Sequence, residues 1–247
     1  MRRRDLALGI ISLIVAWQVL AWIVHAPVLP GAWDVLQALV RETPRGLGRH
    51  FVISGWRVLA SIVISMLVAV PVGLILGQSP RLNRIFSPVI YIVYPIPKIV
   101  FLPIILLFLG IGNTSKIFII FLILFFQILV VVRDQASILR PELIYSVRSL
   151  GAGRRALFRF VYLPATIPAA LTALRVGIGT AIAVLFFAES FATTSGLGYY
   201  IIVESWGRLA YPEMYAGVVA MSVLGLLLYF AADALERRLA PWMFLRE

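Results

Sequence analysis

The chain has 247 residues, of which 62% are hydrophobic and only 13% are charged, and its formal net charge is +11. A soluble domain carries roughly 25% charged residues, so this composition excludes an ordinary soluble domain and predicts an all-α protein in a lipid bilayer. The chain has no cysteine, which excludes disulfides and thiolate metal sites. The basic balance is interpreted as a sign of membrane orientation, and no nucleic-acid partner is expected.

Six segments approach the ~20 apolar residues that a helix needs to cross the hydrocarbon core. The first follows Met1-Arg2-Arg3-Arg4 and is interpreted as an uncleaved helix, because it is long for a signal peptide and His25-Ala26-Pro27 is a poor cleavage sequence. The whole chain, 1–247, is therefore predicted to be one multi-pass transmembrane domain. The six spans are expected at about residues 6–24, 58–77, 85–109, 117–132, 169–188 and 214–232.

The charges of the connecting loops predict the orientation of these spans. With the N-terminus inside and alternating crossings, fourteen arginines fall on the inner side of the membrane. Five basic residues fall on the outer side, namely Arg41, Arg45, Arg49, Lys116 and Arg208. This asymmetry predicts that both termini are cytoplasmic.

The outer connections contain an amphipathic stretch at 33–41 and the sequence Gly196-Leu197-Gly198. We interpret this glycine pair, and the one in Gly110-Ile111-Gly112, as turns that need the backbone freedom of glycine.

The third span is interrupted by Pro95, Pro97 and Pro103, and Lys98 lies at the interruption. Proline removes a backbone donor and breaks a helix, which is tolerated at membrane depth only in buried or cavity-lining places. Lys98 has two interpretations. Its ammonium either meets an anion in a pathway or reaches back to a carbonyl that the prolines leave unpaired.

The inner connection at about 133–163 is predicted to contain a short amphipathic helix. Pro141 suits the first helical position, and Glu142 complements the helix dipole in the first turn. Leu143, Val147 and Leu150 form one apolar stripe, and Gly151 is expected to end the helix. A second amphipathic turn follows Gly153 and is expected to end at Pro164 and Pro168. The first helix either lies on lipid headgroups or docks into a soluble partner.

The fifth span contains Arg175 and ends with Glu189. Each is a candidate pathway residue, because ionisable groups inside a membrane usually face the protein interior. Alternatively, Arg175 forms a structural ion pair and Glu189 caps local structure. Small residues recur every fourth position in this span and predict close packing, either within the chain or against a second copy: Ala169, Ala173, Gly177 and Ala181.

The inner loop resembles the signature of permease subunits of bacterial ATP-binding-cassette (ABC) importers. That signature reads Glu-Ala-Ala-x-x-x-Gly, and here Gly151 is followed by nine residues and then by Val161-Tyr162-Leu163-Pro164, at the spacing of the family's Ile-x-Leu-Pro. Tyr145-Ser146-Val147 replaces Glu-Ala-Ala. The resemblance covers roughly residues 30–232 and points to the sulfonate, taurine, nitrate and bicarbonate branch. The motifs of that branch are Arg148-Ser149-Leu150-Gly151-Ala152, Pro95-Ile96-Pro97-Lys98, Gly110-Ile111-Gly112, Ala188-Glu189 and Gly196-Leu197-Gly198-Tyr199.

The resemblance implies a permease in a bacterial inner membrane that works with two ABC ATPase subunits, a second permease copy and a periplasmic or lipid-anchored binding protein. It implies a small oxyanion substrate, with a thiamine precursor or another heterocycle as the alternative. It also implies that the following residues contact the ATPase: Glu142, Tyr145, Ser146, Val147, Leu150, Gly151, Leu163 and Pro164.

The residues themselves argue against other classes. A phosphate-binding P-loop needs a lysine after glycine, and neither Lys98 nor Lys116 follows one, so the chain is not expected to be the ATPase or to need a cofactor. A secondary transporter is expected to show inverted repeats, and a membrane enzyme to show clustered acid, base or metal groups. The sequence shows neither pattern.

Overall fold

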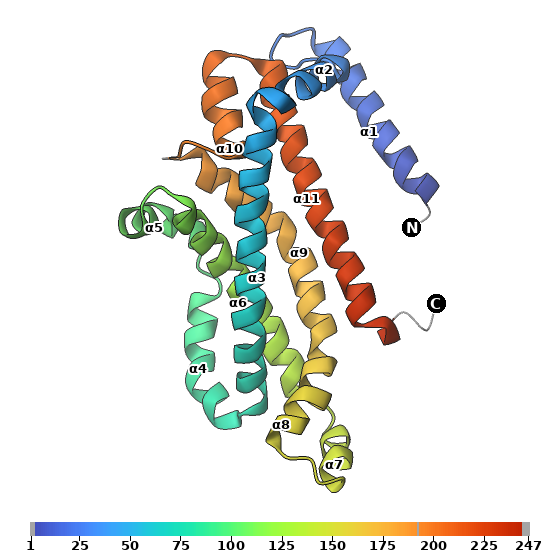
Figure 1. The fold of residues 1–247 in the computed structure, drawn as a ribbon, viewed down its shortest axis with the longest axis vertical. Coiled ribbons are helices and arrows are strands. Elements are labelled where there is room, and N and C mark those ends of the chain that lie inside the picture. Colours follow the sequence, from blue (N-terminus) through green and yellow to red (C-terminus); the bar gives the residue numbers. More distant parts are fainter. Residues whose placement is uncertain (1–2, 192, 244–247) are drawn as a thin grey trace. The chain divides into compact units, whose positions relative to one another are not determined.

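The computed structural model describes residues 3–191 and 193–243, and within them the chain is helical apart from short turns and contains no strand (Figure 1). The predicted all-α fold is confirmed. Arg2 and Arg246, which the charge argument counts on the inner side, lie outside the described residues, as do the side chains of Arg3 and Arg4. The α-helices are α1 (Arg3–Val24), α2 (Ala32–Glu42), α3 (Gly48–Gln78), α4 (Pro80–Val93), α5 (Leu102–Leu109), α6 (Asn113–Ser137), α7 (Pro141–Ser149), α8 (Arg154–Leu157), α9 (Leu163–Ser190), α10 (Leu197–Tyr199) and α11 (Tyr211–Leu239).

Among the described residues, four continuous helical stretches are long and apolar enough to cross a membrane. They are Ala32–Gln78, Asn113–Ser137, Arg154–Ser190 and Tyr211–Leu239. The part of α1 whose side chains are described, Leu8–Val24, is apolar but shorter. The total of six spans and the position of the termini therefore stay predictions.

The predicted third span is a broken one. Helix α4 and the stretch Lys98–Leu109, a 3₁₀ turn followed by α5, meet at 80° and make a fifth crossing if they are counted together. The chain between them contains Pro95 and Pro97, which lack the N–H groups that would continue α4. The interruption that the sequence predicts is thus a sharp bend.

The chain divides into two compact units. The first, called unit 1 below, combines Met1–Gly55 with Glu189–Leu224, and unit 2 combines Trp56–Ala188 with Gly225–Glu247.

Helix α6 forms the centre of unit 2, with α3 packed along it. Ser61 donates a hydrogen bond to the carbonyl of Ile117 at 3.0 Å, and Ser65 donates one to the carbonyl of Phe121 at 3.3 Å. Further along the same face, a Cβ on Gly73 would lie 3.0 Å from the Leu129 carbonyl oxygen. The recurrence of small residues every fourth position of α3 thus allows its backbone to approach α6 closely.

Helix α9 packs on α6 through the small-residue stripe of the fifth span. A Cβ on Gly177 would lie 2.9 Å from side-chain atoms of Leu124 and Gln127, so the absence of a side chain there allows the close approach. Ala173 and Ala181 are buried. The structure therefore shows close packing within the chain, which was one of the two interpretations of this stripe.

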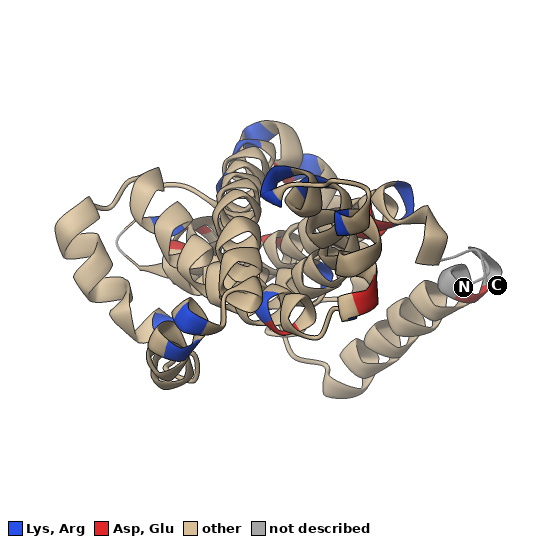
Figure 2. Ribbon diagram, turned by 90° about the horizontal axis from the view of Figure 1, so that it is seen from below, with Lys and Arg blue, Asp and Glu red and all other residues tan. Residues whose placement is uncertain are grey.

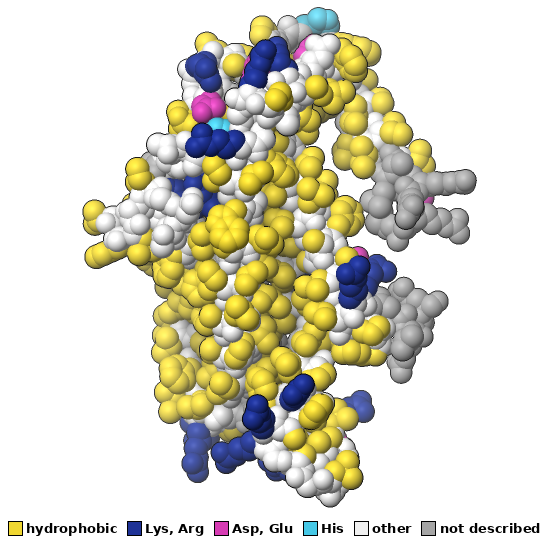
Figure 3. Space-filling view, in the orientation of Figure 1, with side chains coloured by type: hydrophobic (Ala, Val, Ile, Leu, Met, Phe, Trp, Pro, Cys, Tyr) yellow, Lys and Arg dark blue, Asp and Glu magenta, His cyan; other side chains and the backbone are white. Residues whose placement is uncertain are grey.

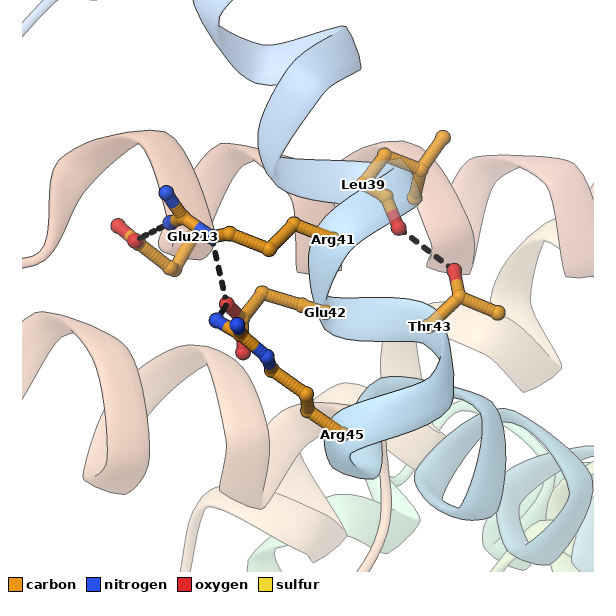
Figure 4. A network of polar contacts seen from close by, with 6 residues as sticks. All are labelled: Leu39, Arg41, Glu42, Thr43, Arg45 and Glu213. Atoms are coloured by element: carbon orange, nitrogen blue, oxygen red, sulfur yellow. Dashed lines mark hydrogen bonds and ion pairs between the residues drawn. The ribbon is translucent and has the colours of Figure 1, made fainter.

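Unit 1 is built around α2, the first turns of α3 and the segment after α9. The predicted amphipathic stretch at 33–41 is confirmed as α2, which buries Val35 and Ala38. Arg41, at the end of α2, contacts Glu213 in the first turn of α11, and Arg45 lies 3.6 Å from Glu42 (Figure 4). These ion pairs hold α2 against the start of α11.

Charged residues occupy few turns of the ribbon (Figure 2). The space-filling view shows lysine and arginine side chains around the α3–α4 turn, around α7 and α8 and near the end of α11, whereas hydrophobic side chains cover much of the long helices (Figure 3). A basic end next to an apolar body is the pattern expected of a helix bundle whose cytoplasmic end follows the positive-inside rule.

Candidate functional site

Helix α7 has the boundaries that its sequence predicts. It begins with Pro141 at its first position and ends at Ser149, and Gly151 has a φ of +81°. The left-handed conformation is one that glycine adopts without the steric cost that a Cβ brings. The prediction of a short helix stopped by Gly151 is therefore confirmed.

Most of the apolar stripe of α7 is exposed within the part of the chain that the structure describes, and of its three residues only Val147 is half-buried. No residue of α7 is buried, and Leu150, directly after it, is 86% exposed. Tyr145 and Leu143 are also exposed. Such a stripe favours a covering surface outside the described residues, either lipid or another protein.

A basic cavity of about 590 Å³ lies beside this helix. Arg81 lines it from α4, Arg148 from α7 and Arg154 from α8, while Phe158 and Tyr162 add aromatic walls. Three guanidinium groups on one cavity favour an anionic or acidic occupant.

The residues Leu163 and Pro164 of the signature lie at the start of α9 and are half-buried. The expectation that Pro164 and Pro168 end the preceding helix is wrong, because the chain is helical from Arg154 to Ser190. The π-helical turn Phe158–Tyr162 shifts the hydrogen-bond register just before Pro164, where the Leu163 N–H bonds to the Phe158 carbonyl. Thr166 Oγ1 then donates to the Tyr162 carbonyl at 2.8 Å. Such adjustments allow prolines within membrane helices.

The inner loop, predicted at 133–163, is shorter in the structure. Helix α6 continues to Ser137, and the helical stretch that ends with α9 begins at Arg154.

Lys98 lies inside the bend of the broken span and is only 8% exposed. Its Nζ donates hydrogen bonds to the carbonyls of Val93, at 3.0 Å, and Tyr94. In an unbroken helix the Val93 carbonyl would accept from residue 97, which here is a proline. The Ile96 N–H bonds to this carbonyl at 3.2 Å, and the lysine supplies a second donor, as its carbonyl-binding interpretation expects. It also lines a cavity of about 400 Å³, so the pathway interpretation stays open.

Arg175 is held by two carboxylates of α11. Its Nη1 lies 2.8 Å from Asp233 Oδ1 and 3.2 Å from Glu236 Oε2, and Thr172 donates to Glu236 at 2.8 Å. This geometry is that of a structural ion pair between α9 and α11.

Replacing Arg175 with methionine is expected to destabilise the protein by about 3 kcal/mol, because the Glu236 side chain, only 4% exposed, would keep its charge without its cation. The thermal midpoint of the purified protein measures this loss. Arg237→Met serves as the control, since its pair with Asp233 is 61% exposed on the arginine side and should contribute less than about 1 kcal/mol. Equal effects of the two variants would contradict the structural role of Arg175. Adding Glu236→Gln to Arg175→Met should restore part of the stability.

Glu189 is fully buried in unit 1. Its carboxylate accepts hydrogen bonds from Ser54 Oγ, at 2.7 and 2.9 Å, and from the Gly198 N–H at 3.1 Å. Ser54 in turn accepts from the Leu197 N–H at 2.8 Å. These bonds fasten the turn at Gly196, whose φ is +115°, so Glu189 caps local structure here. The glycine turns predicted at Gly110 and Gly196 are both confirmed by their positive φ angles.

Two buried polar groups of unit 1 were missed in the sequence. His50 Nδ1 accepts a hydrogen bond from the Gly196 N–H at 2.9 Å. Burial, followed by the nearby charge of Glu42, raises the pKa of Tyr200 to about 12, so this phenol stays protonated. A signal for His50 and Ser54 is their spacing of four residues, which places both on one face of a helix.

Three buried cations of unit 2 were missed as well. Lys116 was assigned to an outer loop and Arg133 to the inner loop, but both are buried within α6. Lys116 donates to the Ile111 carbonyl, and Arg57 Nε donates to Asn113 Oδ1 at 2.9 Å. Without Arg133 on the inner side and Lys116 on the outer side, the basic residues of the loops still lie mostly on the inner side. Within the described residues, no group of His, Cys, Asp or Glu is placed to hold a metal ion.

Comparison with known proteins places these features in a family. Residues 69–244 match the family described as "Binding-protein-dependent transport system inner membrane component". The taurine transport system permease protein TauC of Escherichia coli (strain K12) is 33% identical, over 98% of this chain and 90% of its own length. The formylaminopyrimidine transport permease protein ThiX of Halalkalibacterium halodurans is 25% identical, over 94% of this chain and 93% of its own length.

A solved structure of the MetNI methionine ABC transporter in an inward-facing conformation has the same fold. Its matching chain superposes with a TM-score of 0.66 at 23% identity, over 78% of this chain and 95% of that chain.

Proposed function

The chain belongs to the family of binding-protein-dependent transport system inner membrane components, and we propose that it forms the solute path of an ATP-driven importer whose ATP is hydrolysed by a separate subunit. In this proposal the substrate is a small oxyanion. The similarity to a taurine permease over nearly the whole chain supports that class. A heterocyclic substrate is the second candidate, supported by the formylaminopyrimidine permease among the relatives.

The observation that carries the coupling role is the uncovered apolar stripe of α7. A helix of nine residues is too short to be stable by itself in water, and its apolar side chains are exposed. A groove on an ATPase subunit would bury the stripe, since an amphipathic helix in a groove is a recurrent recognition mode. Movement of that groove would then reach α9 through the continuous helix from Arg154.

The basic cavity next to α7 supports a partner with acidic side chains. Arg81, Arg148 and Arg154 line it, and no Asp or Glu is among its lining residues. Opposite charges across an interface set its register and speed its formation. The ATPase groove is therefore proposed to carry carboxylates at its edge.

A second copy of this chain is proposed to complete the path. Helix α5 presents Leu107 and Phe108 with more than four-fifths of their surface exposed, and α9 presents Val176. Large apolar side chains at these places fit either lipid or a facing copy, and a symmetric pair would offer one α7 to each of two ATPases.

The docking of α7 is tested by crosslinking, which the chain favours because it has no cysteine of its own. A single cysteine at Tyr145 is expected to form a disulfide or short-linker crosslink with a cysteine-scanned groove of the ATPase. The matched control is a single cysteine at Val203, which is exposed but lies on the predicted outer side. Crosslinking at Val203 rather than Tyr145, or contact of Tyr145 with lipid probes alone in the working complex, would contradict the proposal.

The transport activity is tested in proteoliposomes that contain the permease, its ATPase and its binding protein. Uptake of a labelled sulfonate is expected only when ATP is present on the side of the membrane where the ATPase subunits lie. Uptake that does not require ATP would contradict the importer assignment, and uptake of a pyrimidine but not of any oxyanion would favour the second candidate.

A further inference from the structure

The cavity at the bend of the broken span brings together three polar side chains from three elements of unit 2. They are Lys98 at the bend, Gln127 of α6 and Thr180 of α9. The remaining wall is largely apolar and includes Ile96, Ile123, Phe126 and Val184. A mainly apolar cavity of about 400 Å³ with a few convergent polar groups has the character of a small-molecule site.

The cation in this cavity has no carboxylate partner within the part of the chain that the structure describes. The contacts of Lys98 Nζ are the two carbonyls of Val93 and Tyr94 and the faces of two rings, at 4.8 Å from the Phe126 centroid and 5.4 Å from the Tyr94 centroid. An ammonium has three donors, so one N–H remains after the two carbonyls. A buried cation without a counter-ion is costly, and an anion entering the cavity would remove that cost.

The other two polar groups also have unused hydrogen-bonding capacity. Within the described residues, neither the Gln127 carboxamide nor the Thr180 hydroxyl makes a side-chain hydrogen bond. The Gln127 carboxamide lies close to Gly177 of α9, with Oε1 2.9 Å from where a Cβ on that glycine would be. An amide N–H, a hydroxyl and an ammonium N–H can all donate to the oxygens of one oxyanion.

We propose that Lys98, Gln127 and Thr180 form a subsite that binds the anionic head of a small monoanionic solute with a short apolar group, such as an alkyl sulfonate, during its passage. The inference rests on the proposed function and deepens it, because it assigns selectivity for anions to this chain as well as to the binding protein. The rings of Phe126 and Tyr94 and the isoleucines accept the apolar group. Lys98 then has two roles, since it caps the broken helix and attracts the solute.

The test uses the complex of permease and ATPase in nanodiscs of zwitterionic lipid, with ethanesulfonate as the probe. Saturation-transfer NMR measures its binding, and ethanesulfonamide, which has the same shape without the charge, is the matched ligand. Ethanesulfonate is expected to bind at least about tenfold more tightly than the sulfonamide. Equal binding of the two ligands, or no binding of ethanesulfonate to the unmodified complex, would overturn the proposal.

Four substitutions at three residues locate the binding. Gln127→Glu places a carboxylate beside Lys98 without disturbing its carbonyl contacts, and is expected to weaken ethanesulfonate binding by at least about tenfold. Thr180→Val removes only the hydroxyl and is expected to weaken it roughly threefold to tenfold. Lys98→Arg keeps the charge and should retain most of the binding, whereas Lys98→Met should lose it.

The control for Gln127→Glu is Gln37→Glu on the exposed face of α2, which makes the same chemical change far along the chain and should leave binding unaltered. Thermal midpoints show which variants fold. If Lys98→Met does not fold, Gln127→Glu still tests the proposal. Unchanged ethanesulfonate binding by folded Gln127→Glu would overturn the subsite. ATP-dependent uptake by the same complex separates the two levels: an importer that works without this binding would refute the subsite and leave the proposed function intact.

Discussion

Gly151→Val is expected to abolish ATP-driven uptake while the chain stays inserted and bound to its ATPase. Gly151 has a φ of +81°, a region where a Cβ costs roughly 1–2 kcal/mol and a β-branched side chain more. No atom lies within 4 Å of the Cβ position, so the cost arises in the backbone and not from a clash. The turn after α7 must therefore change its conformation.

The effect is large because α7 is short. An isolated helix of fewer than ~12–15 residues is marginal, so a cost of this size at its end competes with its whole stability. Loss of the turn would change the angle between α7 and α8. Movement of the docked helix α7 would then no longer be transmitted to α9 in the same direction. ATP hydrolysis in the assembled complex is expected to continue without uptake, because the ATPase sites lie in another subunit.

Two control variants separate this mechanism from a general intolerance of the loop. Gly153→Val makes the same change at a residue with a φ of −79° and open space around it, and should retain uptake. Gly151→Asn should retain most of the uptake, since asparagine tolerates the left-handed region. The measurements are solute uptake into proteoliposomes and ATP hydrolysis by the same preparation. Normal uptake by Gly151→Val would argue against the lever role of α7.

The boundaries of α7 were predictable because their signals are local. A proline at the first position and a glycine after the last act through the backbone of a single turn, whatever packs around it. The glycine turns at Gly110 and Gly196 follow the same rule. The broken third span was also visible, because prolines remove donors in any environment.

The buried cations were not predictable by the same reasoning. The charge count treats each basic residue near a span end as a loop residue, but Lys116 and Arg133 lie within α6 and find partners in Ile111 and Tyr91. Tyr91 becomes a neighbour of Arg133 only after the chain has folded, whereas the Ile111 carbonyl lies five residues before Lys116. The helix also continues through Pro164 and Pro168, where a π-helical turn directly precedes Pro164. The small-residue row of α3 was present in the sequence and could have been found by the spacing that revealed the row of the fifth span.

Gly196→Ala is expected to be among the most destabilising single substitutions in unit 1, with a loss of at least about 3 kcal/mol. The added Cβ would lie 2.2 Å from the Glu189 carboxyl carbon and 2.3 Å from Oε1, and the residue would keep a φ of +115°. The Glu189 side chain cannot withdraw without breaking its hydrogen bonds to Ser54 and the Gly198 N–H. Clash, backbone strain and lost hydrogen bonds therefore add at one place.

The matched control is Gly207→Ala in the same unit, where the nearest atom to the Cβ position is the Ile202 carbonyl oxygen at 3.6 Å. It is expected to change the thermal midpoint little. Combining Gly196→Ala with Glu189→Asp shortens the acid and should recover part of the loss. A thermal midpoint of Gly196→Ala equal to that of the unmodified protein would contradict the described turn.

The same residues decide between the two interpretations of Glu189. If its carboxylate caps the turn, Glu189→Gln should lower the thermal midpoint and the yield, because an NH₂ group, which cannot accept, replaces one of the oxygens that accept from Ser54 and Gly198. The KM of the surviving protein should stay unchanged. If Glu189 instead contacts the solute, the KM should change while the thermal midpoint does not. The full burial of Glu189 and its bonds to the turn favour the first outcome. A second variant, Ser54→Ala, should then reproduce the loss of stability, because it removes the other half of the same contact.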